Sequence, residues 1–156
     1  MRRKDRLIEK KSELLQILDE GTSCQIAFID KNEPYIVTLN FGYDWSADEL
    51  KLFFHSAKEG RKISLIRDNP RVCFTIVVEG ELITGKKACD FSMTYKSIVG
   101  YGIIKIIHDK KEKRISLNKL MEKYTKKNDW EFQESLLNNT EIYSLEVQEI
   151  TGKTKK

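Results

Sequence analysis

The chain has 156 residues, 40% of them hydrophobic, which is enough for a single domain with one core over residues 1–156. Its 28 lysines and arginines against 24 aspartates and glutamates give a net charge of +4, too mild a balance to predict a nucleic-acid partner. No apolar run has the length of a membrane span, and the charged N-terminus lacks the apolar segment of a signal peptide. We therefore expect a cytoplasmic protein without a membrane partner.

The N-terminal part of the chain has the pattern of a helix followed by a strand. Leucine and isoleucine recur at helical spacing over residues 5–20, and Gly21 is a typical helix stop. Residues 24–29 form a short apolar run, which predicts a strand. A polar turn over residues 30–33 leads into the next extended segment.

Residues 34–62 are the most informative stretch. Alternate side chains in its first half are large and apolar, which predicts a strand with one buried face: Tyr35, Val37, Leu39, Phe41 and Tyr43. A second strand shows the same alternation at Leu50, Leu52 and Phe54. Because a polar connection over residues 44–48 separates the two, we expect an antiparallel hairpin with a wide turn.

The remaining chain predicts more strands and two further helices. In order, we expect a helix after Gly60, a strand over 71–79, a loop over 80–87, an extended region over 91–108, a helix over 110–127, a short amphipathic piece over 130–137, a strand over 142–150 and a polar tail over 151–156. Gly100 and Gly102 inside the extended region indicate a bulge or a tight bend. About six strands with flanking α-helices predict a mainly β fold, either a closed or a partly open barrel.

A candidate anion site lies at the start of the helix after Gly60. The N–H groups at a helix start are unpaired and point outward, and the helix dipole favours a negative charge there. Gly60 allows close approach, and Arg61 and Lys62 add two positive charges. This combination can hold a phosphate group, although a surface helix that begins with basic residues has the same pattern.

His55 is the candidate for proton transfer. It ends an apolar strand shortly before the possible phosphate site, and its ordinary pKa lets it exchange protons near neutral pH. The alternative is a histidine that forms a structural hydrogen bond. The second histidine, His108, is far away in the sequence, and the three cysteines form no Cys-x-x-Cys pair, so we predict no metal site.

Four segments, in this order, carry a resemblance to a known family: PYIVTLNFGY, LFFHSAKEGRKI, NPRVCF and FSMTYKSIVGYG. Together they resemble the flavin-binding split β-barrel superfamily of pyridoxamine 5′-phosphate oxidase-like proteins, and within it the nitroimidazole-resistance branch. The resemblance implies a six-stranded split β-barrel of the FMN-binding type. It also implies a homodimer with FMN at the interface between the two protomers.

The resemblance further implies which residues bind the cofactor. Arg61 and Lys62, with the Gly60 backbone, hold the FMN phosphate. The other implied contacts are Val37, Thr38, Leu39 and Asn40 along the isoalloxazine, Phe54, His55 and Ser56 beside the ribityl chain and ring, and Tyr95 and Ser97 in a segment near the flavin. Two positions depart from the pattern, because Thr38 replaces a common proline and Gly60 replaces the serine of related oxidases.

The implied activity is that of an FMN-dependent oxidoreductase. Electrons from NADH or NADPH would pass through FMN to a small planar or nitroaromatic substrate, with His55 as the candidate catalytic residue. Three alternatives stay open: a non-catalytic flavin carrier or sensor, an enzyme like pyridoxamine 5′-phosphate oxidase, and a small basic barrel that binds single-stranded nucleic acid through its aromatic residues.

Overall fold

The computed structural model describes residues 3–156. In chain order its elements are η1 (Lys4–Arg6, a 3₁₀ helix), β1 (Leu7–Ile8), α1 (Lys11–Glu20), β2 (Cys24–Asp30), β3 (Glu33–Leu39), β4 (Gly42–Ser46), β5 (Glu49–Ala57), α2 (Arg61–Asp68), β6 (Arg71–Ile83), η2 (Ala88–Asp90, a 3₁₀ helix), β7 (Ser92–Ile106), α3 (Lys110–Thr125), α4 (Glu134–Asn139) and β8 (Thr140–Lys155). Within these residues, no helix is long and apolar enough to cross a membrane.

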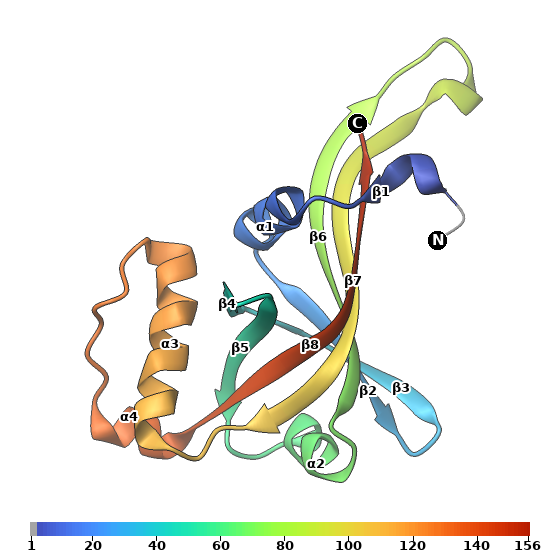
Figure 1. Cartoon of the computed structure of the whole chain (residues 1–156). Coiled ribbons are helices and arrows are strands. Elements are labelled where there is room, and N and C mark those ends of the chain that lie inside the picture. The colour runs from blue at the N-terminus through green and yellow to red at the C-terminus, as the bar shows by residue number, and fades with distance from the viewer. Residues whose placement is uncertain (1–2) are drawn as a thin grey trace.

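The strands form one antiparallel, eight-stranded sheet. Its order is β3-β2-β6-β7-β8-β5-β4, and β1 pairs with β8 beside this path. The long strands β6, β7 and β8 form its curved centre, and the helices lie around it (Figure 1). The prediction of a mainly β fold with flanking helices is confirmed. The strand count differs from the predicted six, and within residues 3–156 no ladder joins β3 to β4, so the sheet is not closed.

Glycines make the curvature of the central strands possible. The β7–β8 register shifts between Tyr101 and Gly102, which marks an irregularity at the expected position. A Cβ atom on Gly102 would lie 2.1 Å from the carbonyl oxygen of Glu146, and one on Gly100 would lie 2.5 Å from the Phe74 ring. Neither position has room for a side chain. The register shift confirms the prediction of a bulge or bend here.

The main core lies on one side of the sheet, beneath α1 and α2. The helices contribute Leu14, Ile17, Leu18, Ile63, Leu65 and Ile66, and these side chains pack on the inward residues of the strands. A second, smaller cluster includes Phe53 of β5, Leu117 of α3 and Leu137 of α4. Helices therefore cover the concave side of the sheet and the region around β4 and β5, as Figure 1 shows.

The two ends of the chain differ from the predictions. The helix expected over 5–20 begins at Lys11, because Leu7 and Ile8 pair as β1 with Lys153 and Gly152 of β8. The tail expected over 151–156 is strand as far as Lys155. Backbone pairing of the two ends stabilises both segments, and a local pattern of side chains does not reveal such pairing.

The central hairpin also differs from the prediction. The strand expected from Tyr35 to Tyr43 is divided at Asn40 and Phe41, where the Tyr124 hydroxyl of α3 donates to the carbonyl oxygen of Thr22 at 2.8 Å and accepts from the Phe41 N–H at 3.1 Å. The two halves have different partners, since β3 pairs with β2 and β4 pairs with β5. The predicted wide turn is wrong: it is a two-residue turn with positive φ at Ala47 and Asp48.

Candidate functional site

The N-terminus of α2 has the geometry of an anion site. β5 ends at Ala57, and the chain reaches α2 through Gly60, the N-cap, whose φ of 126° is a conformation that other residues rarely adopt. A Cβ atom at Gly60 would meet nothing within 4 Å, so the space beside the backbone is open. The N–H groups of Ile63 and Ser64 bond back to the Gly60 carbonyl. The N–H groups that precede them in the chain are those that an anion can use.

Arg61 is anchored to the β2–β3 hairpin. Its Nε lies 2.6 Å and its terminal nitrogen 2.5 Å from Oδ2 of Asp30, and its guanidinium lies 4.3 Å from the centre of the Tyr35 ring. These contacts hold a half-exposed positive charge between α2 and the end of β3. Sequence reasoning did not include Asp30 or Tyr35 in the site. The one available signal was that Asp30 begins the polar turn before Tyr35.

β3 offers backbone groups on a free edge. It lies at one end of the sheet and pairs only with β2 within the described residues. Asp30 and Glu33 flank a two-residue turn and therefore form a hydrogen-bonded pair. Hydrogen-bonded and non-hydrogen-bonded pairs alternate along the two strands, so the backbone N–H and C=O groups of Ile36 and Thr38 point to the free edge. The side chains of Val37 and Leu39 pack against the core instead. Asn40 Nδ2 donates to Thr22 O at 3.1 Å, at the break before β4.

Phe54, His55 and Ser56 of β5 face different surroundings. The Phe54 ring is fully buried and stacks on Tyr143 with a centroid distance of 5.7 Å. His55 points to the opposite side of the strand and is exposed, opposite Ile142 of β8. Partial desolvation lowers the pKa of the His55 imidazole below its usual value. The Ser56 hydroxyl donates to the Ala57 carbonyl at 2.9 Å, so His55 is the most accessible of the three side chains.

Tyr95 and Ser97 lie on β7 at the other end of the molecule. Tyr95 pairs with Lys155 and Ser97 with Lys153, beside the C-terminus. Figure 1 shows that end of the sheet, with β1 and the C-terminus, opposite the end that carries α2. Within one chain the structure therefore brings Gly60, Arg61 and Lys62 close to the β2–β3 hairpin but leaves Tyr95 and Ser97 remote from them.

The convex side of the sheet carries an exposed apolar surface, which we call the outer face. Its large side chains are 42% to 62% exposed: Ile29, Ile36, Val77, Val99 and Tyr101. Thr38, Gln25, Thr75 and Val99 form a row across β3, β2, β6 and β7. Within the described chain, Oε1 of Gln25 is buried without a hydrogen-bond partner. A planar ligand or a second protein surface could cover this face and supply a donor.

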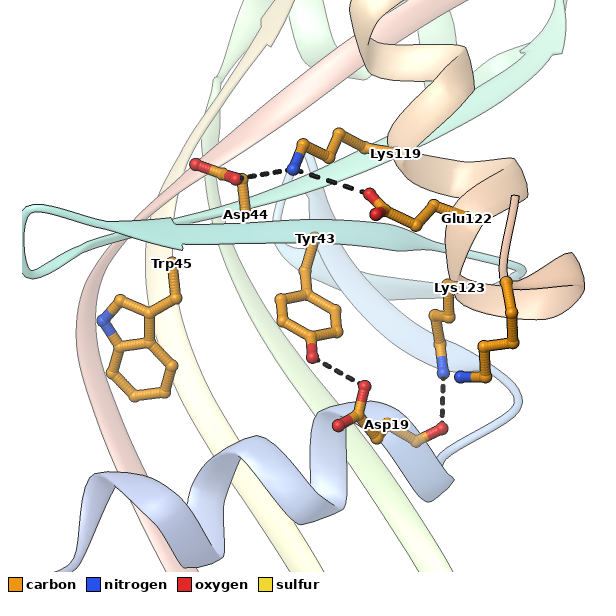
Figure 2. Close-up of a pocket in the computed structure, with 8 residues that line it drawn as sticks. Asp19, Tyr43, Asp44, Trp45, Lys119, Glu122 and Lys123 are labelled. Carbon is orange, nitrogen blue, oxygen red and sulfur yellow. Dashed lines mark hydrogen bonds and ion pairs between the residues drawn. The ribbon is translucent and has the colours of Figure 1, made fainter. Parts of the chain in front are cut away.

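A cavity of about 280 Å³ between α1, β4 and α3 contains none of the predicted site residues. Its side chains bond to one another, as Figure 2 shows. The Tyr43 hydroxyl donates to Asp19 Oδ1 at 2.6 Å, Lys119 lies 3.0 Å from Asp44, and Lys123 donates to the Asp19 carbonyl at 3.0 Å. These bonds tie the three elements together, which is a structural role. Among residues 3–156, no group of three or more His, Cys, Asp or Glu side chains could hold a metal ion.

Comparison with known families and solved structures shows what this chain is similar to. The model of the pyridoxamine 5′-phosphate oxidase family matches residues 10–154. A solved candidate 5-nitroimidazole antibiotic resistance protein from Bacteroides thetaiotaomicron VPI-5482 is 30% identical, with a TM-score of 0.82 over 95% of this chain and 86% of that one. Comparison with curated proteins found no match.

More distant solved structures share the fold. A flavocytochrome from Azotobacter vinelandii is 16% identical, with a TM-score of 0.80 over 100% of this chain and 72% of that one. An FAD- and heme-binding protein from Mycobacterium smegmatis is 15% identical, with a TM-score of 0.83 over 97% of this chain and 74% of that one. The resemblance inferred from the four sequence segments is confirmed: the chain belongs to the pyridoxamine 5′-phosphate oxidase family of flavin-binding split-barrel proteins, near its nitroimidazole-resistance members.

Proposed function

We propose that this protein is an FMN-dependent oxidoreductase that reduces small planar or nitroaromatic compounds with electrons from NADH or NADPH in the cytoplasm. The observation that carries the proposal is the open N-terminus of α2, where Gly60, Arg61 and Lys62 follow β5 after two residues and Arg61 contacts the β2–β3 hairpin. Membership of a flavin-binding family supports the flavin, and the similarity to the Bacteroides protein supports the choice of substrate class.

The residues present fit FMN. The helix start and two cations suit a phosphate dianion, because backbone N–H groups and charged side chains bind it together. The free edge of β3 offers the backbone N–H and C=O of Thr38 to a polar ring edge, and the buried Oε1 of Gln25 can accept one further hydrogen bond. FMN, when bound, supplies the redox chemistry by accepting electrons from the nicotinamide and passing them to the substrate.

The protein's own part is binding, orientation and proton handling. Asp30 and Tyr35 orient Arg61, so its charge is in place before the phosphate arrives. Because desolvation lowers its pKa, His55 is largely neutral at pH 7 and can accept a proton at an imidazole nitrogen. Its exposed position on β5, before α2, makes it the residue that we propose for proton transfer.

A homodimer would complete the site. Within the described chain, helices cover the concave side of the sheet and the outer face stays exposed to water. A flavin ring on that face would be open to solvent on one side. We propose that a second copy covers it and supplies Tyr95 and Ser97, because their part of β7, paired with the end of β8, lies at the end of the sheet opposite α2.

Anaerobic turnover tests this function. The flavin absorbance of the purified protein should bleach on addition of NADH or NADPH and return on addition of a nitroaromatic compound. A protein whose flavin responds to neither nicotinamide would be a carrier or a sensor, and the proposed reductase would be wrong. Reduction without return of the absorbance in the presence of nitroaromatics would contradict the substrate class but not the flavin.

A further inference from the structure

A group of cations gathers where the two ends of the chain meet β7. Arg6, Lys153 and Lys155 surround Tyr95, and we call these four residues the Tyr95 cluster. Arg6 donates to the Tyr95 hydroxyl at 3.5 Å, and Lys153 lies 5.4 Å from the centre of the Tyr95 ring. Lys155 donates to the hydroxyl of Ser92, which lies on β7 together with Tyr95. The pairing of β1 with β8 brings Arg6, 89 residues before Tyr95, into this group.

The positive charge of the cluster is not neutralised within the described chain. Arg6, Lys153 and Lys155 are half-buried, yet among residues 3–156 none of them has a carboxylate within 4.0 Å. Asp5 is paired with Arg3 at 2.5 Å, and Glu20 is paired with Lys96 at 3.0 Å. Three like charges around neutral hydroxyl groups favour an anion, because an anion would form charge-assisted hydrogen bonds with them.

Space for a ligand lies on both sides of the cluster. Residues 154–156 line two cavities. Tyr95 also lines the first, of about 290 Å³, and Arg6 also lines the second, of about 440 Å³. Glu79 faces Tyr95 from β6, and Glu13 lines the larger cavity. The β8 side of Tyr95 carries the cations and is therefore the side on which an anion would bind. Hydrogen bonding and charge from Lys153, with a contribution from Arg6, also lower the pKa of the Tyr95 phenol.

We propose that the Tyr95 cluster is a second anion site, which binds the dianion of a phosphate monoester. Three cations and two hydroxyl groups match the charge and the several acceptor oxygens of a phosphate group better than a carboxylate, which has one charge and two oxygens. The cluster lies at the end of the sheet opposite α2, so it is separate from the proposed FMN phosphate site in the same chain. The phosphate could be free or could be the 2′-phosphate of NADPH, and only the second source depends on the proposed function.

Calorimetric titration of the purified protein with inorganic phosphate at low ionic strength tests the site. We expect saturable binding that weakens by about tenfold or more in the Arg6→Gln/Lys153→Gln double variant, since two charge-assisted contacts are lost. The control is Lys105→Gln, which removes a cation of β7 that is paired with Glu146 at 2.6 Å. If β1 detaches in the double variant, Lys155→Gln, which removes the cation that bonds Ser92 and leaves Arg6 in place, replaces it with an expected loss of severalfold.

Absence of saturable phosphate binding, or equal weakening in Lys105→Gln, would overturn the proposal. Parallel titrations with NADPH and NADH identify the source. If NADPH binds more tightly than NADH and the double variant loses this difference, the site binds the 2′-phosphate of NADPH. If the two nucleotides bind equally, the site binds a free phosphate ester. The flavin content of the purified protein separates the two proposals, because neither Arg6 nor Lys153 is a proposed FMN ligand. A wild-type protein without flavin whose phosphate binding still weakens in the Arg6→Gln/Lys153→Gln variant would contradict the proposed function and leave this site standing.

Discussion

Arg61 shows how one residue connects distant parts of the chain. The sequence predicted Arg61 and Lys62 as phosphate ligands from the local pattern of a glycine and two cations at a helix start. It did not predict that Asp30 and Tyr35 fix the guanidinium, because these partners are 31 and 26 residues away and belong to another hairpin. Local patterns can therefore identify a ligand, but its orientation depends on tertiary contacts.

Replacing Arg61 and Lys62 together by alanine should weaken FMN binding by about a hundredfold or more, since each charged contact to a phosphate contributes about 1.5–3 kcal/mol. Fluorescence titration of the flavin-free protein measures the dissociation constant, and circular dichroism checks the fold. The matched control is Arg67→Ala at the other end of α2, which lies 3.9 Å from Glu141. An unchanged dissociation constant in the double variant would place the phosphate elsewhere.

His55 should titrate below its ordinary pKa of about 6.5, because desolvation disfavours the charged imidazole. The unfolded chain then binds this proton more tightly than the folded chain. Stability should consequently fall as the pH drops through about 6.5, and the loss should level off below the folded pKa. NMR titration gives the pKa, and thermal unfolding of wild type and His55→Gln at pH 5 and pH 8 gives the linkage. A wild-type protein with no greater loss at pH 5 than His55→Gln would contradict this sign.

At the scale of elements, the sequence predicted most strands but not their partners. Alternation correctly assigned the buried face of Tyr35, Val37 and Leu39. It did not show that the strand divides at Asn40, because the division depends on the Tyr124 hydroxyl of α3. The pairing of β1 with β8 was also missed, since two residues are too few for a recognisable period. What escaped prediction in each case was an interaction between segments far apart in the sequence.

Because β3 pairs with β2 on one edge, proline should be tolerated at alternate positions of β3 and not at the positions between them. Thr38→Pro should leave the protein folded, because the Thr38 N–H points away from β2. Val37→Pro should destabilise the protein by about 1–3 kcal/mol, because it removes a ladder bond to Ile26 and leaves the Ile26 carbonyl without its partner. Chemical unfolding of the two variants measures the difference. Equal destabilisation by both prolines would show that the register is wrong.

On the scale of the whole molecule, an asymmetric distribution of helices leaves one side of the sheet bare. α1 and α2 cover the concave side, and the outer face keeps five large apolar side chains exposed. A second copy on this face would bury them and enclose a ring bound beside β3. The sequence alternation indicated one apolar side for each strand. It could not show that the other side of the assembled sheet also gathers apolar residues, which come from β2, β3, β6 and β7.

Charge on the outer face should separate the protomers. Val77→Lys/Val99→Lys places two cations in the middle of this apolar surface, where burial against a second copy would be costly. Sedimentation equilibrium should show a dimer for wild type and a monomer with reduced flavin content for the variant. The control, Ile115→Lys, changes an exposed apolar residue of α3 away from this face. A wild-type monomer that retains flavin would refute the shared site.

The most direct measurement is a crystal structure of the protein with FMN. The phosphate should lie within hydrogen-bond distance of the N–H groups at the start of α2, with Arg61 and Lys62 beside it and the ring between β3 and a second copy. A phosphate bound away from α2, or a ring that leaves the β3 edge vacant, would contradict this prediction.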